Sequence, residues 1–201
     1  MPRVIRPFHP SDLGAIYRIC LLTGLAGGDS SHLYRNPELL GHVYAGPYPV
    51  ADPGLTFVVA DDEGVAGYIV ATGDTAAFER WREESWWPVL REQYPPVEDP
   101  QDGTEDHELV GRVHETWSTD DAYLAEFPAH MHIDLLPRAQ GQGLGRQLVE
   151  TLAAALRERG VRGVHLGVSS ENPGAISFYR RVGFTTVEDL PWGFVLGLPL
   201  A

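Results

Sequence analysis

Residues 140–146 of the chain read Gln140-Gly141-Gln142-Gly143-Leu144-Gly145-Arg146. The β-rich run His130–Leu136 precedes them, and a segment through Arg159 with strong helical periodicity follows. The buried stripe that this periodicity predicts consists of Leu148, Val149, Leu152 and Leu156. The sequence therefore predicts a tight, glycine-rich turn that leads from a strand into an amphipathic helix.

Such a turn is suited to an anion. The first N–H groups of a helix have no partner within the helix, and the helix dipole favours negative charge there. Glycines let a phosphate approach the backbone closely, and Arg146 adds positive charge. A tight turn without a ligand is the alternative for this segment alone. The glycine spacing does not match a dinucleotide-binding turn, and the absence of lysine excludes a P-loop.

A second motif follows the β-rich run Val164–Val168 and spans residues 172–184. It reads Asn172-Pro173-Gly174-Ala175-Ile176-Ser177-Phe178-Tyr179-Arg180-Arg181-Val182-Gly183-Phe184. Asn172 is a favourable N-cap, Pro173 suits the first helical position, and Gly183 ends the helix. Phe178 and Tyr179 are either core aromatics or part of a site, and the Tyr179 hydroxyl requires a partner in both cases.

Together the two motifs resemble the defining motifs of the GNAT N-acetyltransferases, in order and in spacing, between Ala129 and Phe184. The chain also resembles the acetyltransferase-like C-terminal domain of O-GlcNAcase. That resemblance extends to residues outside the two motifs: Gly46-Pro47-Tyr48, Asp61, Gly64, Gly67-Tyr68, Phe78, Trp86, Pro88, Tyr94 and Tyr123-Leu124-Ala125-Glu126-Phe127-Pro128.

The resemblance implies an α/β (α+β) GNAT fold over residues 1–201 as a single domain. We expect a mixed central sheet of about seven strands with splayed strands four and five, flanking helices, and a helical insertion between strands three and four. The expected strands are Arg3–Phe8, Leu55–Ala60, Val65–Thr72, His130–Leu136, Val164–Val168, Thr185–Glu188 and Phe194–Leu198. The expected helices run from Ser11 or Asp12 to Leu22, from Pro37 to Gly46, from Phe78 to Tyr94, from Glu108 to Thr116, from Gly143 to Arg159 and from Pro173 to Arg181.

The resemblance also implies an acetyl-CoA co-substrate in the gap between the splayed strands. Main-chain groups of Ile133, Asp134 and Leu135 would bind the pantetheine and polarise the acetyl carbonyl, and Asn172 and Phe178 would lie nearby. The N–H groups of the turn would hold the pyrophosphate; the turn consists of Gln140, Gly141, Gln142, Gly143, Leu144, Gly145 and Arg146. A substrate amine would attack the thioester directly, and Tyr179 would protonate the departing thiolate as general acid.

The general base is open in this sequence. Some GNAT proteins carry a glutamate where this chain has Gly167, so the base must come from elsewhere. Asp134 is the first candidate and His132 the second, and strand alternation puts both on one face with His130. Two histidines and a carboxylate also suggest zinc, but side chains on one strand rarely converge on a metal, so no metal is expected.

The segment from Asp74 to Phe127 has an unusual composition. It carries 15 acidic and 4 arginine residues, a balance of -11, and four of the five tryptophans: Trp81, Trp86, Trp87 and Trp117. We interpret residues 74–127 as an insertion. Its tryptophans either form a wall for a cationic acceptor or pack the insertion onto the sheet, and an exposed remainder would mark a homodimer contact.

The bulk composition limits the class of function. A net charge of -13 argues against nucleic acid and favours an amine or other cationic acceptor, whether a small molecule or a protein amine. No run of 18 apolar residues is present, Met1–Arg6 lacks a signal-like stretch, and Cys20 is the one cysteine. These features predict a cytoplasmic protein, and the composition suggests a bacterial source. The leading hypothesis is an acetyl-CoA-dependent N-acetyltransferase; a module that binds acetyl-CoA or a protein tail without turnover, or a purely structural scaffold, is the alternative.

Overall fold

The computed structural model describes residues 3–96, 103–116 and 122–200 of the chain. Its centre is a seven-stranded mixed sheet in the order β1-β2-β3-β4-β5-β7-β6, in which β4 and β5 are parallel and the other neighbours antiparallel. The strands are β1 Val4–Pro7, β2 Thr56–Asp61, β3 Gly64–Thr72, β4 Ala129–Leu135, β5 Gly163–Ser169, β6 Thr185–Leu190 and β7 Gly193–Pro199. Every expected strand is present.

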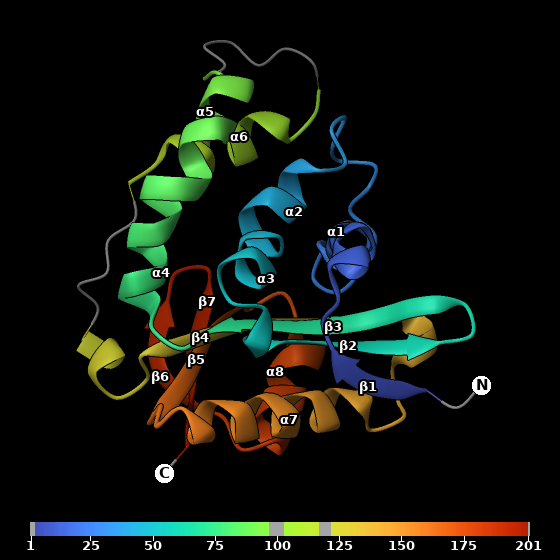
Figure 1. The fold of residues 1–201 in the computed structure, drawn as a ribbon, viewed down its shortest axis with the longest axis vertical. Coiled ribbons are helices and arrows are strands. Elements are labelled where there is room, and N and C mark those ends of the chain that lie inside the picture. Colours follow the sequence, from blue (N-terminus) through green and yellow to red (C-terminus); the bar gives the residue numbers. More distant parts are fainter. Residues whose placement is uncertain (1–2, 97–102, 117–121, 201) are drawn as a thin grey trace.

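Helices cover both faces of the sheet (Figure 1). One face carries α7 and α8, and the other carries the helices from the first two-thirds of the chain. The α-helices are α1 Leu13–Thr23, α2 Leu39–Tyr44, α3 Pro47–Ala51, α4 Thr75–Trp81, α5 Trp87–Gln93, α6 Asp106–His114, α7 Leu144–Glu158 and α8 Pro173–Arg181. Short helical turns are η1 Pro10–Asp12, η2 Pro53–Leu55, η3 Arg82–Trp86, η4 Ala122–Ala125 and η5 Pro137–Ala139, of which η3 is a π-helix.

Strand alternation separates two hydrophobic cores across β4. Ala129 and Met131 point to the α7 side and are fully buried there. His130 and His132 point to the opposite side, where both contact Tyr48. Because the odd positions of this strand are apolar and the even positions are polar, one strand serves both a core and a site. This alternation confirms the predicted common face of His130, His132 and Asp134.

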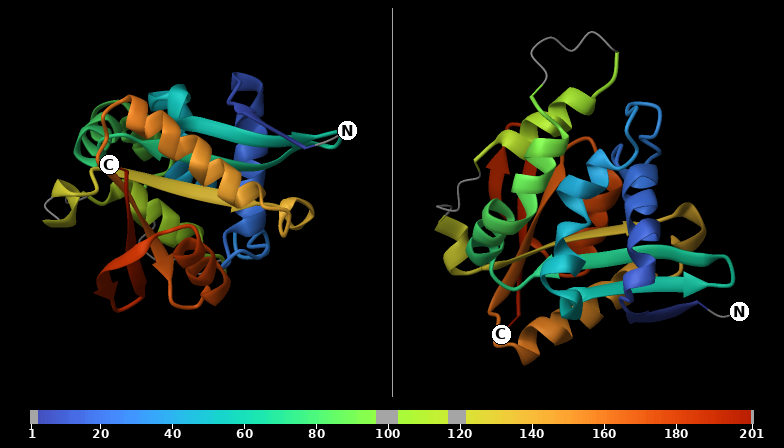
Figure 2. Two further views of the ribbon diagram at one scale, coloured as in Figure 1. Left: turned by 90° about the horizontal axis from the view of Figure 1, so that it is seen from below. Right: turned by 45° about the horizontal axis from the view of Figure 1, so that its top comes forward.

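Strands β4 and β5 pair over only two residues each. Ala129 lies opposite Val164 and His130 lies opposite His165, and beyond these pairs the strands diverge. Figure 2 shows the gap opening between β4 and the β5–β7–β6 half of the sheet. The predicted splay is therefore present, and the edge of β4 from residue 131 onward is not paired with β5.

The segment between β3 and β4 forms the expected helical insertion. Helices α4 and α5 join through the π-turn η3, and Trp87 at the start of α5 is completely buried. The Arg82 guanidinium lies 4.8 Å from the centroid of the Trp87 ring, and Trp81 and Trp86 stack with centroids 6.1 Å apart. These three tryptophans therefore pack the insertion, which is the second of the two alternatives given for them above. Trp117 lies outside the described residues.

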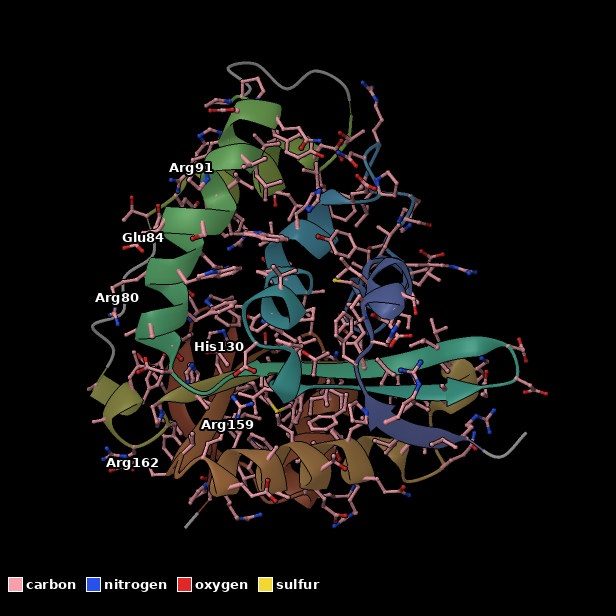
Figure 3. The ribbon with its side chains drawn as sticks, in the orientation of Figure 1. Arg80, Glu84, Arg91, His130, Arg159 and Arg162 are labelled. Carbon is pink, nitrogen blue, oxygen red and sulfur yellow. The ribbon has the colours of Figure 1, made fainter. Side chains whose placement is uncertain are left out.

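Charged side chains cover the outer side of this insertion. Arg80, Glu84 and Arg91 point away from the body of the molecule along α4, η3 and α5 (Figure 3). Arg91 forms a two-point ion pair with Glu83, with N···O distances of 2.8 and 3.0 Å. Much of the local charge is therefore solvated or paired on the surface.

Several helix boundaries differ from those expected: α4 begins at Thr75 and not at Phe78, and α6 runs from Asp106 to His114 and not from Glu108 to Thr116. Helix α2 begins at Leu39 and ends at Tyr44, and Pro37 lies before it; a separate short helix, α3, begins at Pro47. Asp12 precedes α1, but its side chain accepts hydrogen bonds from Arg6 and from the His9 N–H. The carboxylate therefore braces β1 against α1 and makes no cap bond to α1. Within the described residues, no helix combines the length and apolar character needed to cross a membrane.

Leu148→Ala tests the core beneath the sheet. Leu148 lies on the face of α7 that packs against the sheet and is fully buried, so its truncation leaves a cavity. We expect the free energy of unfolding to fall by about 2–5 kcal/mol. Val89→Ala on the exposed side of α5 is the control, with an expected change below about 0.5 kcal/mol. Urea unfolding of both variants measures the difference. Equal losses would contradict this placement of the core.

Candidate active site

A cleft of about 1330 Å³ passes through the sheet where β4 and β5 diverge. On the α7 side it is lined by the turn before α7 and by the first two turns of α8. On the opposite side it is lined by residues of α1, α2 and α6 and by the chain after α1. The cleft therefore connects the two faces of the sheet through the opening in it.

The glycine-rich turn forms the floor of the cleft at the start of α7. Gly141 and Gly143 have φ values of +72° and +78°, which are costly for residues with a side chain. Gly145 faces the Phe178 ring, which would lie 3.1 Å from a Cβ at that position. The absence of side chains at these positions thus brings the turn, α7 and α8 close together and keeps the backbone accessible.

Polar side chains brace this turn from outside. Gln140 Nε2 donates to the Leu135 carbonyl at 2.8 Å, and Gln142 Nε2 donates to the Arg138 carbonyl at 3.0 Å. Arg146 donates to the Arg181 carbonyl at 3.2 Å, and this bond links the start of α7 to the end of α8. Gln140 and Arg146 line the cleft. The side chains of Gln142 and Leu144 do not, because Gln142 turns toward η5 and Leu144 is buried.

Helix α8 presents Asn172 and Tyr179 to the cleft. Asn172 caps the helix by accepting a hydrogen bond from the Ala175 N–H at 3.0 Å, as its position in the motif predicted. Tyr179 is 8% exposed, and its hydroxyl makes no hydrogen bond within the part of the chain that is described. Burial, together with the nearby charge of Asp134, raises the pKa of Tyr179. The phenol is therefore protonated at neutral pH.

Strand β4 forms the wall of the cleft between its two sides. Ile133, Asp134 and Leu135 all line it, as expected. The Tyr68 hydroxyl donates to Asp134 Oδ2 at 2.5 Å. Burial raises the pKa of Asp134, and the hydrogen bond from Tyr68 opposes that shift. Asp134 is thus a half-buried acidic side chain close enough to Tyr179 to influence its pKa.

His132 lines the same wall, on the same face of β4 as Asp134 and two residues before it. Its Nε2 lies 2.9 Å from the Tyr48 hydroxyl, which also lies 2.8 Å from His130 Nε2. Burial lowers the pKa of His132 to about 4, so the imidazole is neutral at physiological pH. No group of three or more His, Cys, Asp or Glu side chains in the described residues is arranged to hold a metal ion.

The cleft also contains residues that the sequence did not indicate as site residues. They lie on the side away from the glycine-rich turn, and they are Tyr34, Tyr44, Glu108, Arg112 and Trp192. Trp192 is 54% exposed, and its ring covers Gly167, where a Cβ would lie 2.9 Å from the indole. Gly167 thus makes room for an aromatic wall. The one feature of the sequence that pointed to this part of the cleft was the glycine at position 167 in place of a glutamate. That feature did not indicate Trp192.

The comparison with protein families decides the identity of the fold. The family model described as "Acetyltransferase (GNAT) family" matches residues 30–184, which include both motifs, β4 and most of the residues that line the cleft. The chain belongs to the acetyltransferase (GNAT) family. The resemblance in the two motifs is therefore confirmed. The roles expected of individual residues in this GNAT chain remain predictions.

Relatives of known sequence and structure agree with this assignment. Protein O-GlcNAcase from Rattus norvegicus is 24% identical over 180 residues, which are 89% of this chain and 20% of that protein. The chain thus spans about a fifth of the length of the O-GlcNAcases that it matches. The crystal structure of SsHAT is 38% identical, with a TM-score of 0.92 and full coverage of both chains.

A more distant structure shares the fold. The putative acetyltransferase yncA from Salmonella typhimurium, solved with its cofactor acetyl-CoA, is 16% identical with a TM-score of 0.61. The alignment covers 100% of this chain and 95% of yncA. This likeness extends the fold assignment to a GNAT-type structure determined with a bound cofactor.

Acid pH should destabilise this GNAT domain through the half-buried imidazoles of β4. In the unfolded chain a histidine has a pKa near ~6.5, whereas the pKa of His132 is about 4 in the folded protein and that of His130 lies well below its ordinary value. Between these pH values the unfolded chain binds more protons. Stability should therefore fall as pH decreases from about 6.5 to 4, by up to ~1.4 kcal/mol per pH unit for each such histidine.

Urea unfolding at a series of pH values measures this dependence. In His132→Gln the free energy of unfolding should fall less steeply with decreasing pH, because one half-buried imidazole is lost. His32→Gln, at an exposed position, is the control for removal of a histidine. If the free energy of unfolding of His132→Gln had the same pH dependence as that of the wild type, His132 would not be the neutral, half-buried imidazole described here.

Proposed function

We propose that the protein is an N-acetyltransferase that moves the acetyl group of acetyl-CoA to an amine by direct attack in a ternary complex. The observation that carries this proposal is the cleft through the sheet. It joins a glycine-rich turn suited to an anion on one face to a chamber with aromatic and charged side chains on the other, with Tyr179 and strand β4 between them. Two substrates entering from opposite faces would meet at β4.

Acetyl-CoA would occupy the side of α7 and α8. The N–H groups of residues 141–146 at the start of α7 would receive the pyrophosphate, because a helix N-terminus with glycine-conferred access suits phosphate oxygens. The edge of β4 from Ile133 to Leu135 is not paired with β5 and would bind the amides of the pantetheine. The same main-chain groups would polarise the acetyl carbonyl. Membership of the GNAT family and the fold shared with yncA support this placement.

The chemical step would be a single acyl transfer. The amine nitrogen forms a bond to the acetyl carbon, the C–S bond breaks, and its electron pair leaves with sulfur. Tyr179 would donate its phenolic proton to that thiolate, since the hydroxyl is protonated and otherwise unpartnered within the described residues. The carboxylate of Asp134 helps to keep this proton in place until sulfur begins to leave.

The attacking nitrogen must also lose a proton. Two side chains of β4 that line the cleft have lone pairs for this purpose, Asp134 and His132. Asp134 accepts a hydrogen bond from the Tyr68 hydroxyl, and His132 is neutral. The general base of the proposed reaction is therefore one of these two residues of β4, in place of the glutamate that some GNAT proteins carry at the β5 position of Gly167.

The acceptor would enter from the side of α2 and α6. Three aromatic side chains line that part of the cleft, Tyr34, Tyr44 and Trp192, together with one carboxylate, Glu108, and one guanidinium, Arg112. Burial, together with smaller effects of the nearby Glu105 and Glu108, raises the pKa of Tyr34 to about 12. Aromatic faces and carboxylates both favour a cation, so we propose an amine carried on an apolar or cationic body as the acceptor.

Tyr179→Phe tests the general acid. The variant keeps the aromatic packing and removes the proton, so kcat for acetyl transfer should fall by roughly 100-fold or more while the Kd for acetyl-CoA is unchanged. Thiol release across a panel of amines and calorimetry with acetyl-CoA measure the two quantities. An unchanged kcat would refute the role of Tyr179. Binding of acetyl-CoA without turnover of any amine would favour a binding module over an enzyme.

Gly145→Leu tests the turn. A side chain at this position collides with Phe178 and Leu135, so α7 and α8 must separate and the Kd for acetyl-CoA should rise at least 100-fold. Gly14→Ala in α1 is the control, because a Cβ there meets no atom within 4 Å. Calorimetry on both variants gives the comparison. Wild-type affinity in Gly145→Leu would mean that the turn does not hold the cofactor.

A further inference from the structure

Tyr48 connects two histidines of β4 and belongs to neither motif. It lies on α3, is 3% exposed, and directs its hydroxyl between the rings of His130 and His132. The hydroxyl oxygen is 2.8 Å from His130 Nε2 and 2.9 Å from His132 Nε2. A single hydroxyl proton cannot be donated to both nitrogens, so one nitrogen must accept and the other must donate.

Thr75 decides which of the two accepts. Its hydroxyl lies 2.8 Å from the Pro128 carbonyl and 2.8 Å from His130 Nδ1. A carbonyl only accepts, so the Thr75 proton goes to Pro128, and His130 Nδ1 must donate to the Thr75 oxygen. His130 is neutral because burial and the neighbouring positive groups lower its pKa well below the usual range. With Nδ1 protonated, His130 Nε2 carries a lone pair and accepts from Tyr48.

The same reasoning extends to His132. The Tyr48 proton is directed to His130, so the Tyr48 oxygen accepts a hydrogen bond from His132 Nε2. His132 is also neutral, and its one ring proton is therefore on Nε2. Its Nδ1 carries a lone pair and has no hydrogen-bond partner within the described residues. His132 lines the cleft, and Nδ1 is its ring nitrogen that makes no hydrogen bond to the described residues of the wall.

We propose that Thr75, His130 and Tyr48 are positioning residues that hold His132 as the Nε2–H tautomer, and that His132 Nδ1 takes the proton from the attacking amine. The base role rests on the proposed function; the tautomer rests on the hydrogen-bond chain together with the neutral state of both imidazoles. Figure 3 shows His130 at the level of the sheet, beneath the helices from which Tyr48 approaches.

The step is balanced with the chemistry proposed above. As the nitrogen bonds to the acetyl carbon, its N–H bond breaks, the bonding pair stays on nitrogen, and the proton passes to His132 Nδ1. The imidazolium then keeps its Nε2–H bond to the Tyr48 oxygen, which stabilises the charge. Asp134 is less suited to this step, since Oδ2 already accepts a 2.5 Å hydrogen bond from Tyr68. Its charge serves Tyr179 on the opposite side of the cleft.

NMR of the free protein labelled with ¹⁵N-histidine tests the tautomer without any substrate. We expect His132 in the wild type to show a protonated Nε2 and an unprotonated Nδ1 at pH 7. Tyr48→Phe removes the acceptor of the Nε2–H, so the spectrum should change toward a mixture of tautomers. Tyr17→Phe is the matched control, because Tyr17 also bonds a histidine, His42, at 2.9 Å but does not line the cleft. A protonated Nδ1 on His132 in the wild type would overturn the proposal.

Kinetics test the consequence for acetyl transfer. Tyr48→Phe should lower kcat roughly 10- to 100-fold with the Kd for acetyl-CoA unchanged, and Tyr17→Phe should keep the wild-type kcat. His130→Leu removes the acceptor for the Tyr48 proton and should lower kcat to a similar degree. His130→Gln restores an acceptor oxygen near the Nε2 position and should recover most of the loss. Equal kcat for His130→Leu and His130→Gln would contradict a positioning role.

The two levels of the hypothesis fail separately. If no amine is acetylated by the wild type, the proposed function and the base role both fall, and the NMR result still decides the tautomer. If transfer occurs and depends on Tyr179 but Tyr48→Phe retains wild-type kcat, the proposed function stands and the positioning chain is wrong. The pair of His130 variants gives this answer even if Tyr48→Phe does not fold.

Discussion

The divergence of β4 from β5 after two residue pairs is the constraint on which the site depends. A sheet that remains paired buries its main-chain groups in the ladder, whereas this opening leaves one edge of β4 available and lets a cleft pass from one face to the other. The break is stable because each half of the sheet has its own helical cover. Helices α7 and α8 pack beneath it, and α1 to α6 pack above.

The alternation of β4 turns this opening into a chemical site. Its apolar side chains face α7 and complete a core, while His130, His132 and Asp134 face the opposite helices. Each of the three is held by a tyrosine, Tyr48 for the histidines and Tyr68 for the carboxylate. Buried polar groups are costly unless they are hydrogen-bonded, so these two tyrosines stabilise the wall as well as orient it.

The insertion contributes differently from what its composition suggests. Its tryptophans attract attention in the sequence, but Trp81, Trp86 and Trp87 are used for packing. The contribution to the cleft comes from α6, through Glu108 and Arg112. The aromatic wall comes from Trp192, between β6 and β7, which is far from the insertion along the chain. Tryptophans are large enough to serve as core residues, so their number in a segment does not identify a binding surface.

The sequence by itself determined the GNAT family, the order of the strands along the chain, the glycine-rich turn before α7 and the cap of α8, because these depend on local patterns. Glycines at the start of α7, a proline after the Asn172 cap, and apolar periodicity each act within a few residues. Tertiary structure alone decided which residues line the cleft on the side of α2 and α6, and which side chains contact β4. Tyr48 lies 82 residues from His130, and Trp192 lies over Gly167 across a strand pair. Contacts of this kind have no local signature, since the sheet and not the sequence spacing brings the groups together.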